Sequence, residues 1–291
     1  MNLILQALTS AAVGMSAIEA IAAHAGAARV EPMPSRTPDI AAWRCTGVQW
    51  SEAVRAQVED ACLAAQVDYA RIDTPRTLQD FRLVAMDMDS TLITIECIDE
   101  IADMQGLKPQ VAEITEAAMR GEIEFRESLT RRVALLKGLD AAALQRVYDE
   151  RLTLSLGAEN MLRAVQAAGL KTLLVSGGFT FFTDRMKTRL GLDVTHSNQL
   201  EIIDGKLTGK VLGGIVDAEE KRATVERVCA DIGAAPAQAI VMGDGANDLR
   251  MMSVSGLSVA FRAKPVVRAQ ADVALNFVGL DGILSLFEHR D

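Results

Sequence analysis

The chain is short of aromatic residues and of cysteine. Aromatic residues make up only 4% of its 291 residues, so the core must be built mainly from Ala, Leu, Val, Ile and Met. The four cysteines, Cys45, Cys62, Cys97 and Cys229, lie far apart and form no CxxC pair. This spacing argues against a zinc site and against a disulfide framework, and it predicts reduced thiols in a cytoplasmic protein.

Long apolar runs are also missing. No stretch approaches the ~20 uninterrupted apolar residues that a membrane helix requires. Residues 1–27 are apolar and rich in alanine, but Glu19 interrupts them and no Lys or Arg precedes Arg29. The positively charged start of a signal peptide is therefore absent, and we expect neither export nor a membrane partner.

Positive charge is in deficit, with a net charge of -9 and a pI of about 5.0. An acidic surface repels nucleic acid, so we expect no nucleic-acid partner, and an anionic substrate would need a local positive site. The 49% of hydrophobic and 24% of charged residues are typical of a globular protein. The length is sufficient for one large domain and one small one.

Residues 1 to about 75 predict a small α/β unit. Its pattern indicates the element order βαββαβ, which is the ferredoxin-like arrangement and resembles the ACT domains that bind amino acids. We expect strands at 2–8, 27–33, 39–46 and 67–72, and helices at 12–25 and 52–65, the second capped by Ser51. Residues 73–79, which include Pro75, are the expected linker.

From residue 81 onward, apolar strands alternate with helices. Such alternation predicts a parallel sheet with helices on both faces and active residues at the carboxyl ends of its strands. Asp204-Gly205, between two β-like runs, predicts a hairpin at 202–211. A helical block from about 96 to 150 interrupts the alternation and predicts a cap over the site. The other expected strands are 81–87, 171–175, 239–242 and 257–261, and the expected helices are 180–190, 219–233 and 249–253.

The stretch VAMDMDSTL (84–92) places Asp87 and Asp89 directly after a predicted strand. Two carboxylates so close together are costly unless a cation neutralises them or one of them carries a proton. Mg²⁺ fits, since it prefers oxygen ligands and is often bound by carboxylates together with phosphate. Two solvated acids in a turn would give the same pattern, so this pair alone carries little weight.

Two Gly-rich loops follow later predicted strands. In LLVSGGFTFF (173–182), the Ser176 hydroxyl can donate to phosphate, and the two glycines let backbone N–H groups approach an anion; a flexible connection explains this loop equally well. In IVMGDGANDLRMM (240–252), Asp244 lies just past a strand end, where it can bind a metal. Asp248 lies near a helix start, where an acid is favourable for structural reasons too.

Lys221 lies near the start of a predicted helix, where its charge opposes the helix dipole. A solvated surface lysine is the commoner case, and the local sequence does not favour Lys221 over Arg222 as a functional group.

The four elements occur in the order DxD, Ser-Gly-Gly, Lys and GDxxxD. In this order they resemble the haloacid dehalogenase superfamily of phosphohydrolases over about residues 81–285. The implied fold is a Rossmannoid parallel-sheet core at 81–291 with a helical cap at about 96–150, preceded by the ACT-like unit at 1–75. The chain further resembles the phosphoserine phosphatases in DMDST with Glu96, in FRESLTRRVALL (125–136), in SGGF and in GDGANDL.

This resemblance implies a mechanism for hydrolysing phosphoserine, the last step of serine biosynthesis. Asp87 would be the nucleophile that forms an aspartyl-phosphate, and Asp89 the acid and base. Mg²⁺ would be held by Asp87, the Asp89 backbone carbonyl and Asp244, with Asp248 as a ligand or a partner of metal-bound water. Ser176, the Gly177 amide and Lys221 would hold the phosphoryl oxygens, and Gly178 and Asn247 would also bind the substrate.

The cap would supply specificity for an amino acid. Glu96 would bind the substrate ammonium group, and Arg132 would bind its carboxylate through two parallel hydrogen bonds. Met119 and Phe125 would form an apolar lid. Without the resemblance, a surface charge cluster at Arg131 and Arg132, and core positions for Met119 and Phe125, would be the simpler interpretations.

Three alternatives remain open at this point: a phosphotransferase that passes the phosphoryl group to homoserine, a phosphatase for another small phosphate, and a non-catalytic amino-acid sensor. The intact Asp87 and Asp89 pair argues against the sensor. For the N-terminal unit, interaction or homodimerisation through a sheet edge and serine sensing are about equally expected.

Overall fold

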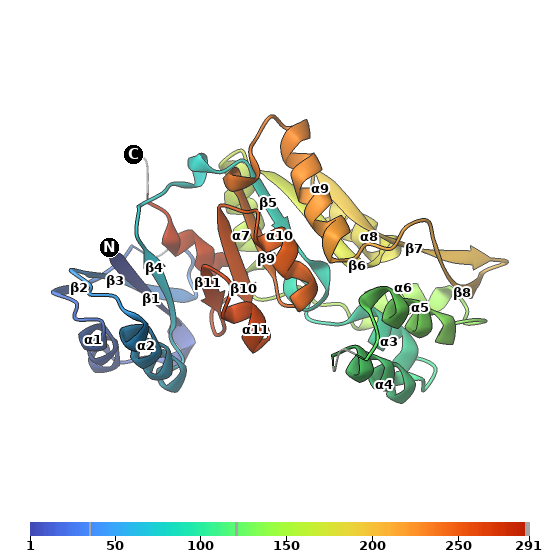
Figure 1. Cartoon of the computed structure of the whole chain (residues 1–291), viewed down its shortest axis with the longest axis horizontal. Coiled ribbons are helices and arrows are strands. Elements are labelled where there is room, and N and C mark those ends of the chain that lie inside the picture. Colours follow the sequence, from blue (N-terminus) through green and yellow to red (C-terminus); the bar gives the residue numbers. More distant parts are fainter. Residues whose placement is uncertain (35, 120–121, 289–291) are drawn as a thin grey trace.

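The computed structural model describes residues 1–34, 36–119 and 122–288, except for the side chain of Met119. Figure 1 shows three parts: a small N-terminal unit at one end, a central sheet with helices, and a helical cap at the other end. The sheet is mixed and runs through the first two parts in the order β2-β3-β1-β4-β11-β10-β9-β5-β6-β7-β8.

The N-terminal unit has the predicted ferredoxin-like topology. Its four strands pair in the order β2-β3-β1-β4, and all neighbours are antiparallel. Ser51 caps α2 as expected, because its Oγ accepts a hydrogen bond of 3.3 Å from the Val54 amide. The elements are β1 (Asn2–Leu8), α1 (Met15–His24), β2 (Arg29–Pro32), β3 (Ile40–Thr46), α2 (Glu52–Ala65) and β4 (Asp68–Ile72).

The two faces of this small sheet have different neighbours. Leu3 and Leu5 of β1 belong to an apolar cluster with residues of α1 and α2, which cover one face. Ile4, between them, points to the opposite face and joins the core of the rest of the chain. A 3₁₀ helix at Leu280–Leu286 contacts β1 there, so the C-terminal segment packs against the N-terminal unit.

The central sheet is parallel, as predicted, except for its last strand. Strands β11, β10, β9, β5, β6 and β7 are parallel neighbours, and β8 returns antiparallel to β7 through the Asp204-Gly205 turn. Both turn residues have positive φ, as a two-residue hairpin loop requires. The strands are β5 (Leu83–Met86), β6 (Lys171–Phe179), β7 (Val194–Ile203), β8 (Lys206–Leu212), β9 (Ala239–Gly243), β10 (Leu257–Phe261) and β11 (Val273–Leu275).

Helices cover both faces of this sheet. Alternate residues of β5 point to opposite sides, so Leu83 and Ala85 join one apolar cluster while Val84 and Met86 join another. The first cluster includes residues of α9 (Ala218–Asp231), α10 (Leu249–Met252) and α11 (Pro265–Arg268). The second includes residues of α7 (Ala158–Ala167) and α8 (Thr180–Leu190).

The cap lies between β5 and α7 in the sequence, as predicted, and Figure 1 shows it beyond the end of the central sheet. The β7–β8 hairpin supports it: the Gly138 and Ala141 amides donate to the Leu207 and Gly205 carbonyls, and the Leu207 amide donates to the Leu139 carbonyl. The cap helices are α3 (Cys97–Asp103), α4 (Lys108–Met119), α5 (Phe125–Leu135) and α6 (Ala142–Glu150).

Some predicted boundaries were wrong, and some elements were not predicted. Helix α1 begins at Met15 rather than at residue 12, because Ala12 takes a left-handed conformation. The expected linker ends in a 3₁₀ turn at Leu78–Asp80. Helix α7, strand β11 and the first half of β7 carry no motif that distinguished them in the sequence. In the part of the chain that the structure describes, no helix is long and apolar enough to cross a membrane.

Candidate active site

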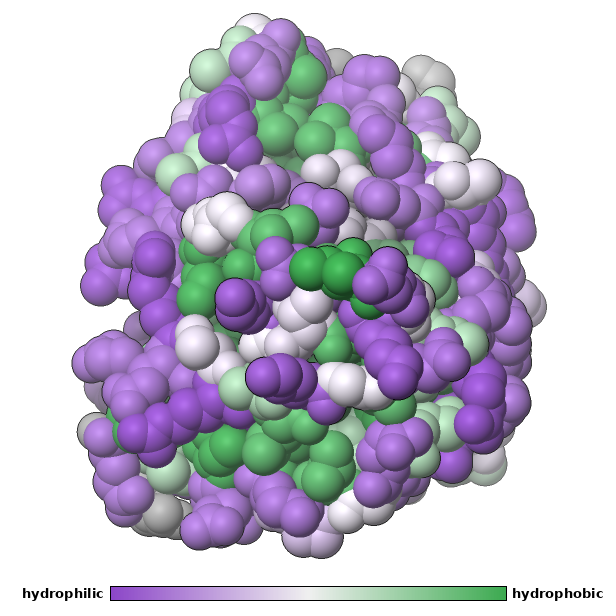
Figure 2. All heavy atoms as spheres, turned by 90° about the vertical axis from the view of Figure 1, so that its right-hand side faces the viewer, coloured by the Kyte–Doolittle hydropathy of each residue, from purple (hydrophilic) through white to green (hydrophobic). Residues whose placement is uncertain are grey.

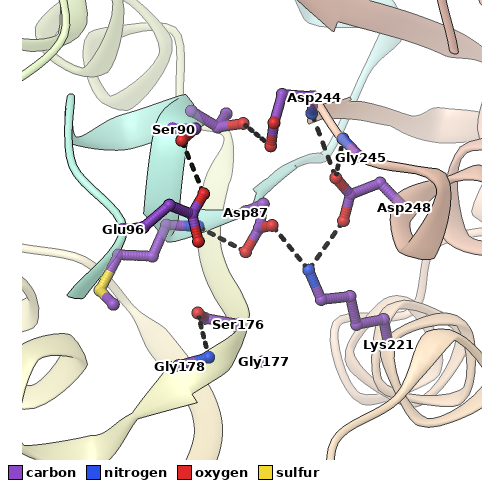
Figure 3. Close-up of polar contacts among 12 residues, drawn as sticks. Asp87, Ser90, Glu96, Ser176, Gly177, Gly178, Lys221, Asp244, Gly245 and Asp248 are labelled. Atoms are coloured by element: carbon purple, nitrogen blue, oxygen red, sulfur yellow. Dashed lines mark hydrogen bonds and ion pairs between the residues drawn. The ribbon is translucent and has the colours of Figure 1, made fainter. Parts of the chain in front are cut away.

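The groups singled out in the sequence meet at the carboxyl edge of the central sheet, where parallel strands aim their following loops. Asp87 follows β5, Ser176 lies in the last part of β6, and Asp244 follows β9. Lys221 reaches the same point from the first turn of α9. Figure 3 shows the Asp87 carboxylate at the centre of these groups.

Asp87 is buried and held at both carboxylate oxygens. Its Oδ1 accepts a 2.7 Å hydrogen bond from the Met88 amide, and its Oδ2 lies 2.9 Å from Lys221 Nζ. These contacts fix the direction of the carboxylate, which a nucleophile requires.

Lys221 is not the surface residue that its sequence context allowed. Its side chain is fully buried, and Nζ lies 2.7 Å from Asp248 Oδ1 as well as near Asp87. Burial alone would lower the pKa of Lys221, but Asp248 and Asp87 outweigh it and raise this pKa, so the ammonium group stays charged.

Asp248 organises the loop after β9. Its Oδ2 accepts hydrogen bonds of 3.1 Å from the Asp244 and Gly245 amides, while its Oδ1 binds Lys221. A Cβ at position 243 would lie 2.3 Å from Asp248 Oδ2, so only glycine fits there. Both oxygens of Asp248 are thus engaged within the protein.

Three carboxylates, from Asp87, Asp244 and Asp248, have oxygens within 4.8 Å of one another. With one ammonium group beside them, two negative charges are left uncompensated. Burial, followed by the charges of Asp248 and Glu96, raises the pKa of Asp244 to about 7. Burial also raises the pKa of Asp87, and Asp248 and Asp244 add to this rise while Lys221 opposes it. A hard divalent cation would relieve this accumulation of charge, so the donor set fits Mg²⁺.

Asp89 is placed differently from Asp87. Its Oδ1 accepts a 3.1 Å hydrogen bond from the Cys97 amide, at the start of the cap. Burial, with the nearby charge of Glu96, raises the pKa of Asp89 to about 7. Its carboxylate is not one of the three that form the acidic cluster. Two neighbouring acids therefore have separate environments, as an acid and a nucleophile need.

The Ser-Gly-Gly loop presents polar groups toward Asp87 and Asp89. Ser176 Oγ accepts a 2.8 Å hydrogen bond from the Gly178 amide, which leaves the hydroxyl hydrogen free to donate to a ligand. A Cβ at position 178 would lie 2.6 Å from Asp89 Oδ2, so this close approach requires glycine. At position 177, a Cβ would lie 3.1 Å from Cζ of Phe125, where the cap meets the loop.

The cap contributes charge of both signs. Glu96 Oε1 accepts a 2.7 Å hydrogen bond from Ser90 Oγ, and desolvation by the surrounding protein raises the pKa of Glu96 although its side chain is open to the cavity. Burial lowers the pKa of Arg132, while Asp99, Glu96 and Asp89 partly offset this effect. The buried Nε of Arg132 has no hydrogen-bond partner among the described residues. An orphaned donor beside a cavity is suited to an anionic ligand group.

Asp87 and Asp89, the Ser-Gly-Gly loop and the charged cap residues line one small cavity of about 90 Å³. A larger cleft of about 390 Å³ lies between the N-terminal unit and strands β10 and β11, and it contains none of the predicted site residues. The chemistry assigns the site to the smaller of these two cavities, because its described lining combines Asp87 and Asp89, the Gly-rich loop and the cap charges. Its lining is Asp87, Asp89, Glu96, Ile98, Phe125, Leu129, Arg132, Ser176, Gly177, Gly178, Phe179 and Asn247.

Met119 cannot be placed in the site, since its side chain lies outside the described residues. Three contacts were not predicted. Thr91 Oγ1 donates to Asp244 Oδ1 at 3.4 Å, Asn198 binds the backbone at Gly177, and Arg126 of the cap pairs with Asp217 at the start of α9. Asn198 lies in a strand outside the motifs, whereas Thr91 and Arg126 lie within DMDST and FRESLTRRVALL without a predicted role of their own. Only burial and contact reveal these three contacts.

Comparison with known proteins agrees with this geometry. The model of the family "haloacid dehalogenase-like hydrolase" matches residues 81–256. A phosphoserine phosphatase from Polaromonas sp. is 59% identical over 214 residues, which cover 72% of this chain and 91% of that protein.

Solved structures extend the likeness to the whole chain. A probable phosphoserine phosphatase from Vibrio cholerae is 35% identical and covers 98% of this chain and 86% of its own, with a TM-score of 0.81. A substrate-bound phosphoserine phosphatase complex and a phospho-aspartyl intermediate analogue of such an enzyme each have a TM-score of 0.67 and 36% identity, covering 72% of this chain and 99% of theirs. The chain therefore belongs to the haloacid dehalogenase-like hydrolases and, within them, to the phosphoserine phosphatase family.

Proposed function

We propose that this protein hydrolyses O-phosphoserine to serine and phosphate through an aspartyl-phosphate on Asp87. The single observation that carries the proposal is the buried, doubly held Asp87 carboxylate, which faces the Ser176 loop, Lys221 and a cap with both Glu96 and Arg132. Relatives named as phosphoserine phosphatases, up to 59% identical, support the choice of substrate.

In the first step, a carboxylate oxygen of Asp87 attacks phosphorus and the bond from phosphorus to the serine oxygen breaks. Asp89 donates its proton to the departing oxygen, which a pKa of about 7 permits near neutral pH. The Ser176 hydroxyl, the Gly177 amide and the Lys221 ammonium group bind the phosphoryl oxygens and stabilise the charge that shifts onto them.

In the second step, Asp89 is ionised and acts as a base. It takes a proton from a water molecule whose oxygen attacks phosphorus, and the bond between phosphorus and Asp87 breaks to release phosphate. Phe125, which lies against Gly177, limits the access of other water from the cap side.

Mg²⁺ is the cofactor that we propose for the acidic cluster. Asp87, Asp244 and the Asp89 backbone carbonyl would hold it, and Asp248 would support it through the loop amides that it already binds. When bound, the ion neutralises the carboxylates and the phosphate so that Asp87 can approach phosphorus.

Recognition of serine is assigned to the cap. We propose that Arg132, whose buried Nε lacks a partner in the described structure, binds the substrate carboxylate, and that Glu96 binds the ammonium group. Phe125, Met119, Gly178 and Asn247 complete the proposed contacts with the substrate.

The decisive test is phosphate release from phosphoserine, phosphothreonine and sugar phosphates, with and without Mg²⁺. Phosphoserine should be the best substrate, and Asp87→Asn should abolish turnover while the protein stays folded. Adding homoserine shows whether phosphate is instead transferred to a second acceptor.

Arg132→Ala should raise KM for phosphoserine more than KM for an aryl phosphate, which has no carboxylate for Arg132 to bind. Unchanged turnover by Asp87→Asn would refute the mechanism.

For the N-terminal part, we propose an ACT-like domain at 1–75 joined through 73–79 to a phosphatase domain at 81–291, with the cap at about 96–150. Two observations support this division: the unit has its own apolar core, and β4 and β11 are joined by one residue pair, Tyr69 and Ala274. Limited proteolysis should cut first within 73–79.

We also propose a homodimer that works in the cytoplasm. Ile202, Ile203 and Leu212 on β7 and β8 are 45%, 57% and 41% exposed. Strands β7 and β8 lie at the right in Figure 1, and Figure 2 shows hydrophobic side chains gathered on the face at that end of the molecule. All four cysteines are free and buried, which suits a reducing compartment. Light scattering of the parent and of Ile203→Glu would test the dimer.

A further inference from the structure

Strand β6 leaves its neighbour where the Ser-Gly-Gly loop begins. The parallel pairing with β7 runs to Ser176 opposite Ser197, and the next paired residue of β6 is Phe179, opposite Asn198. Gly177 and Gly178 therefore bulge out of the ladder. A bulge redirects backbone groups away from the sheet, and it leaves groups that the ladder no longer pairs.

The side chain of Asn198 takes the place of the missing strand contact. Its Nδ2 donates a 2.8 Å hydrogen bond to the Gly177 carbonyl, and the side chain is buried, with 1% of its surface exposed. Its Oδ1 accepts a 2.8 Å hydrogen bond from the Val216 amide. Both ends of the amide are thus engaged with backbone.

These two partners belong to the two loops that surround the phosphate site. Gly177 is in the Ser-Gly-Gly loop, and Val216 precedes Asp217, the N-cap of the helix that carries Lys221. The loops are in contact, since the Val216 carbonyl lies 3.7 Å from the position that a Cβ of residue 177 would take. One buried amide therefore connects the backbone of the loop that donates to phosphate with the helix that supplies the ammonium group.

We propose that Asn198 is a positioning residue. It fixes the position of the Gly177 amide relative to Lys221, so that both groups can bind the same phosphoryl group. It acts through these two partners and does not touch the substrate. This inference rests on the proposed function in one respect, namely that Gly177 and Lys221 bind phosphate. An aspartate would keep an acceptor for Val216 but would lose the donor to Gly177 and set a negative charge beside the site.

The experiment compares Asn198→Ala and Asn198→Asp with Thr183→Val. Thr183 is a matched control, because its buried hydroxyl forms a 2.8 Å hydrogen bond with Ser197, the neighbour of Asn198 on β7, and this bond joins α8 to β7 rather than the two loops to each other. The readouts are kcat and KM for phosphoserine, kcat/KM for an aryl phosphate, the inhibition constant of inorganic phosphate, and the urea midpoint of unfolding.

Both Asn198 variants should lose roughly 10- to 100-fold in kcat/KM on both substrates and should bind inorganic phosphate several-fold more weakly, as a small misplacement of phosphate-binding groups predicts. Thr183→Val should keep kcat/KM and the inhibition constant of phosphate within about twofold of the parent. This should hold even if its urea midpoint falls as far as those of the Asn198 variants. Folded Asn198 variants with parental phosphate inhibition, or losses that Thr183→Val reproduces, would overturn the proposal. The aryl phosphate and inorganic phosphate arms keep this test independent of the choice of phosphoserine as substrate.

Discussion

At the scale of single residues, the site is defined by buried charge. Lys221 is fully buried between the carboxylates of Asp87 and Asp248. Because of this burial, losing either contact would cost much more free energy than losing a contact at the surface. A charge that loses its partner in such a place keeps its desolvation cost without compensation.

Replacing Lys221 with Met should therefore destabilise the protein strongly. The change leaves Asp87 and Asp248 buried beside each other, and breaking a buried pair in this way costs about 3–5 kcal/mol of unfolding free energy. Lys171→Met is the control, because Lys171 Nζ lies 2.6 Å from Asp193 in a pair whose lysine is 54% exposed, and such a pair is worth at most about 1 kcal/mol. Urea unfolding at pH 7 measures both. Equal losses for the two variants would contradict the assigned role of burial.

The environment of Asp89 predicts the pH dependence of the first chemical step. Burial and Glu96 raise the pKa of this acid to about 7, so its protonated fraction falls tenfold per pH unit above that value. The first step uses the protonated form, and kcat/KM for phosphoserine should accordingly decline above about pH 7. Bound Mg²⁺ favours the carboxylate and can only move this decline to lower pH.

The control for this pH dependence is an aryl phosphate whose leaving group needs no proton. Its kcat/KM should show a weaker alkaline decline than that of phosphoserine in the same buffers. A phosphoserine profile that rises to pH 9 would show that Asp89 is not the acid.

At the scale of helices and strands, the cap is tied to the core by a pair that spans two elements. Arg126 of α5 lies 2.5 Å from Asp217 Oδ2, while Asp217 Oδ1 caps α9 by accepting from the Glu220 amide. The neighbouring Phe125 rests against Gly177. The pair therefore joins the cap to the core beside the cavity.

Arg126→Ala should weaken this link between the cap and the core. We expect KM for phosphoserine to rise by up to about fivefold, since an exposed ion pair is worth at most about 1 kcal/mol. Arg131→Ala is the control, because Arg131 is similarly exposed on the same helix but pairs with Glu127 within it. KM of the parent should also rise with salt, since screening weakens the pair, and this salt dependence should shrink in Arg126→Ala only. Equal effects of the two variants on KM would contradict a role of the Arg126–Asp217 pair in substrate binding.

The arrangement of helices and strands also explains which site residues could be predicted from the sequence. Strand ends followed by acids or glycines placed Asp87, Ser176 and Asp244 at one edge of a parallel sheet, because that topology leaves few alternatives. Asn198 and Arg126 could not be found in this way. Their partners lie 21 and 91 residues away in the sequence, and those contacts exist only after the β6 bulge and the cap have formed. Likewise, nothing local distinguished a buried Lys221 from a surface lysine.

At the scale of the whole molecule, the N-terminal unit is joined to the central sheet by a short strand pairing. Strand β4 pairs with β11 at a single residue pair, and a cleft of about 390 Å³ lies alongside. Asp68 forms a polar link between the two parts. Its carboxylate is buried and accepts hydrogen bonds of 2.7–2.9 Å from the amides of Asn276, Phe277 and Val278.

Asp68→Ala should therefore uncouple the two parts while sparing the active site. The change leaves three backbone donors without their acceptor, at a cost of about 1–3 kcal/mol for each one that stays buried. Urea unfolding followed at Trp43 and Trp50, both in the N-terminal unit, should separate from the loss of phosphatase activity, because the unit then opens at lower urea than the core. Asp73→Ala is the control, since Asp73 pairs at 2.7 Å with exposed Arg71 and makes none of these contacts. Coincident transitions in Asp68→Ala, at the parental midpoint, would mean that apolar packing of β1 on the Leu280–Leu286 segment alone joins the two parts.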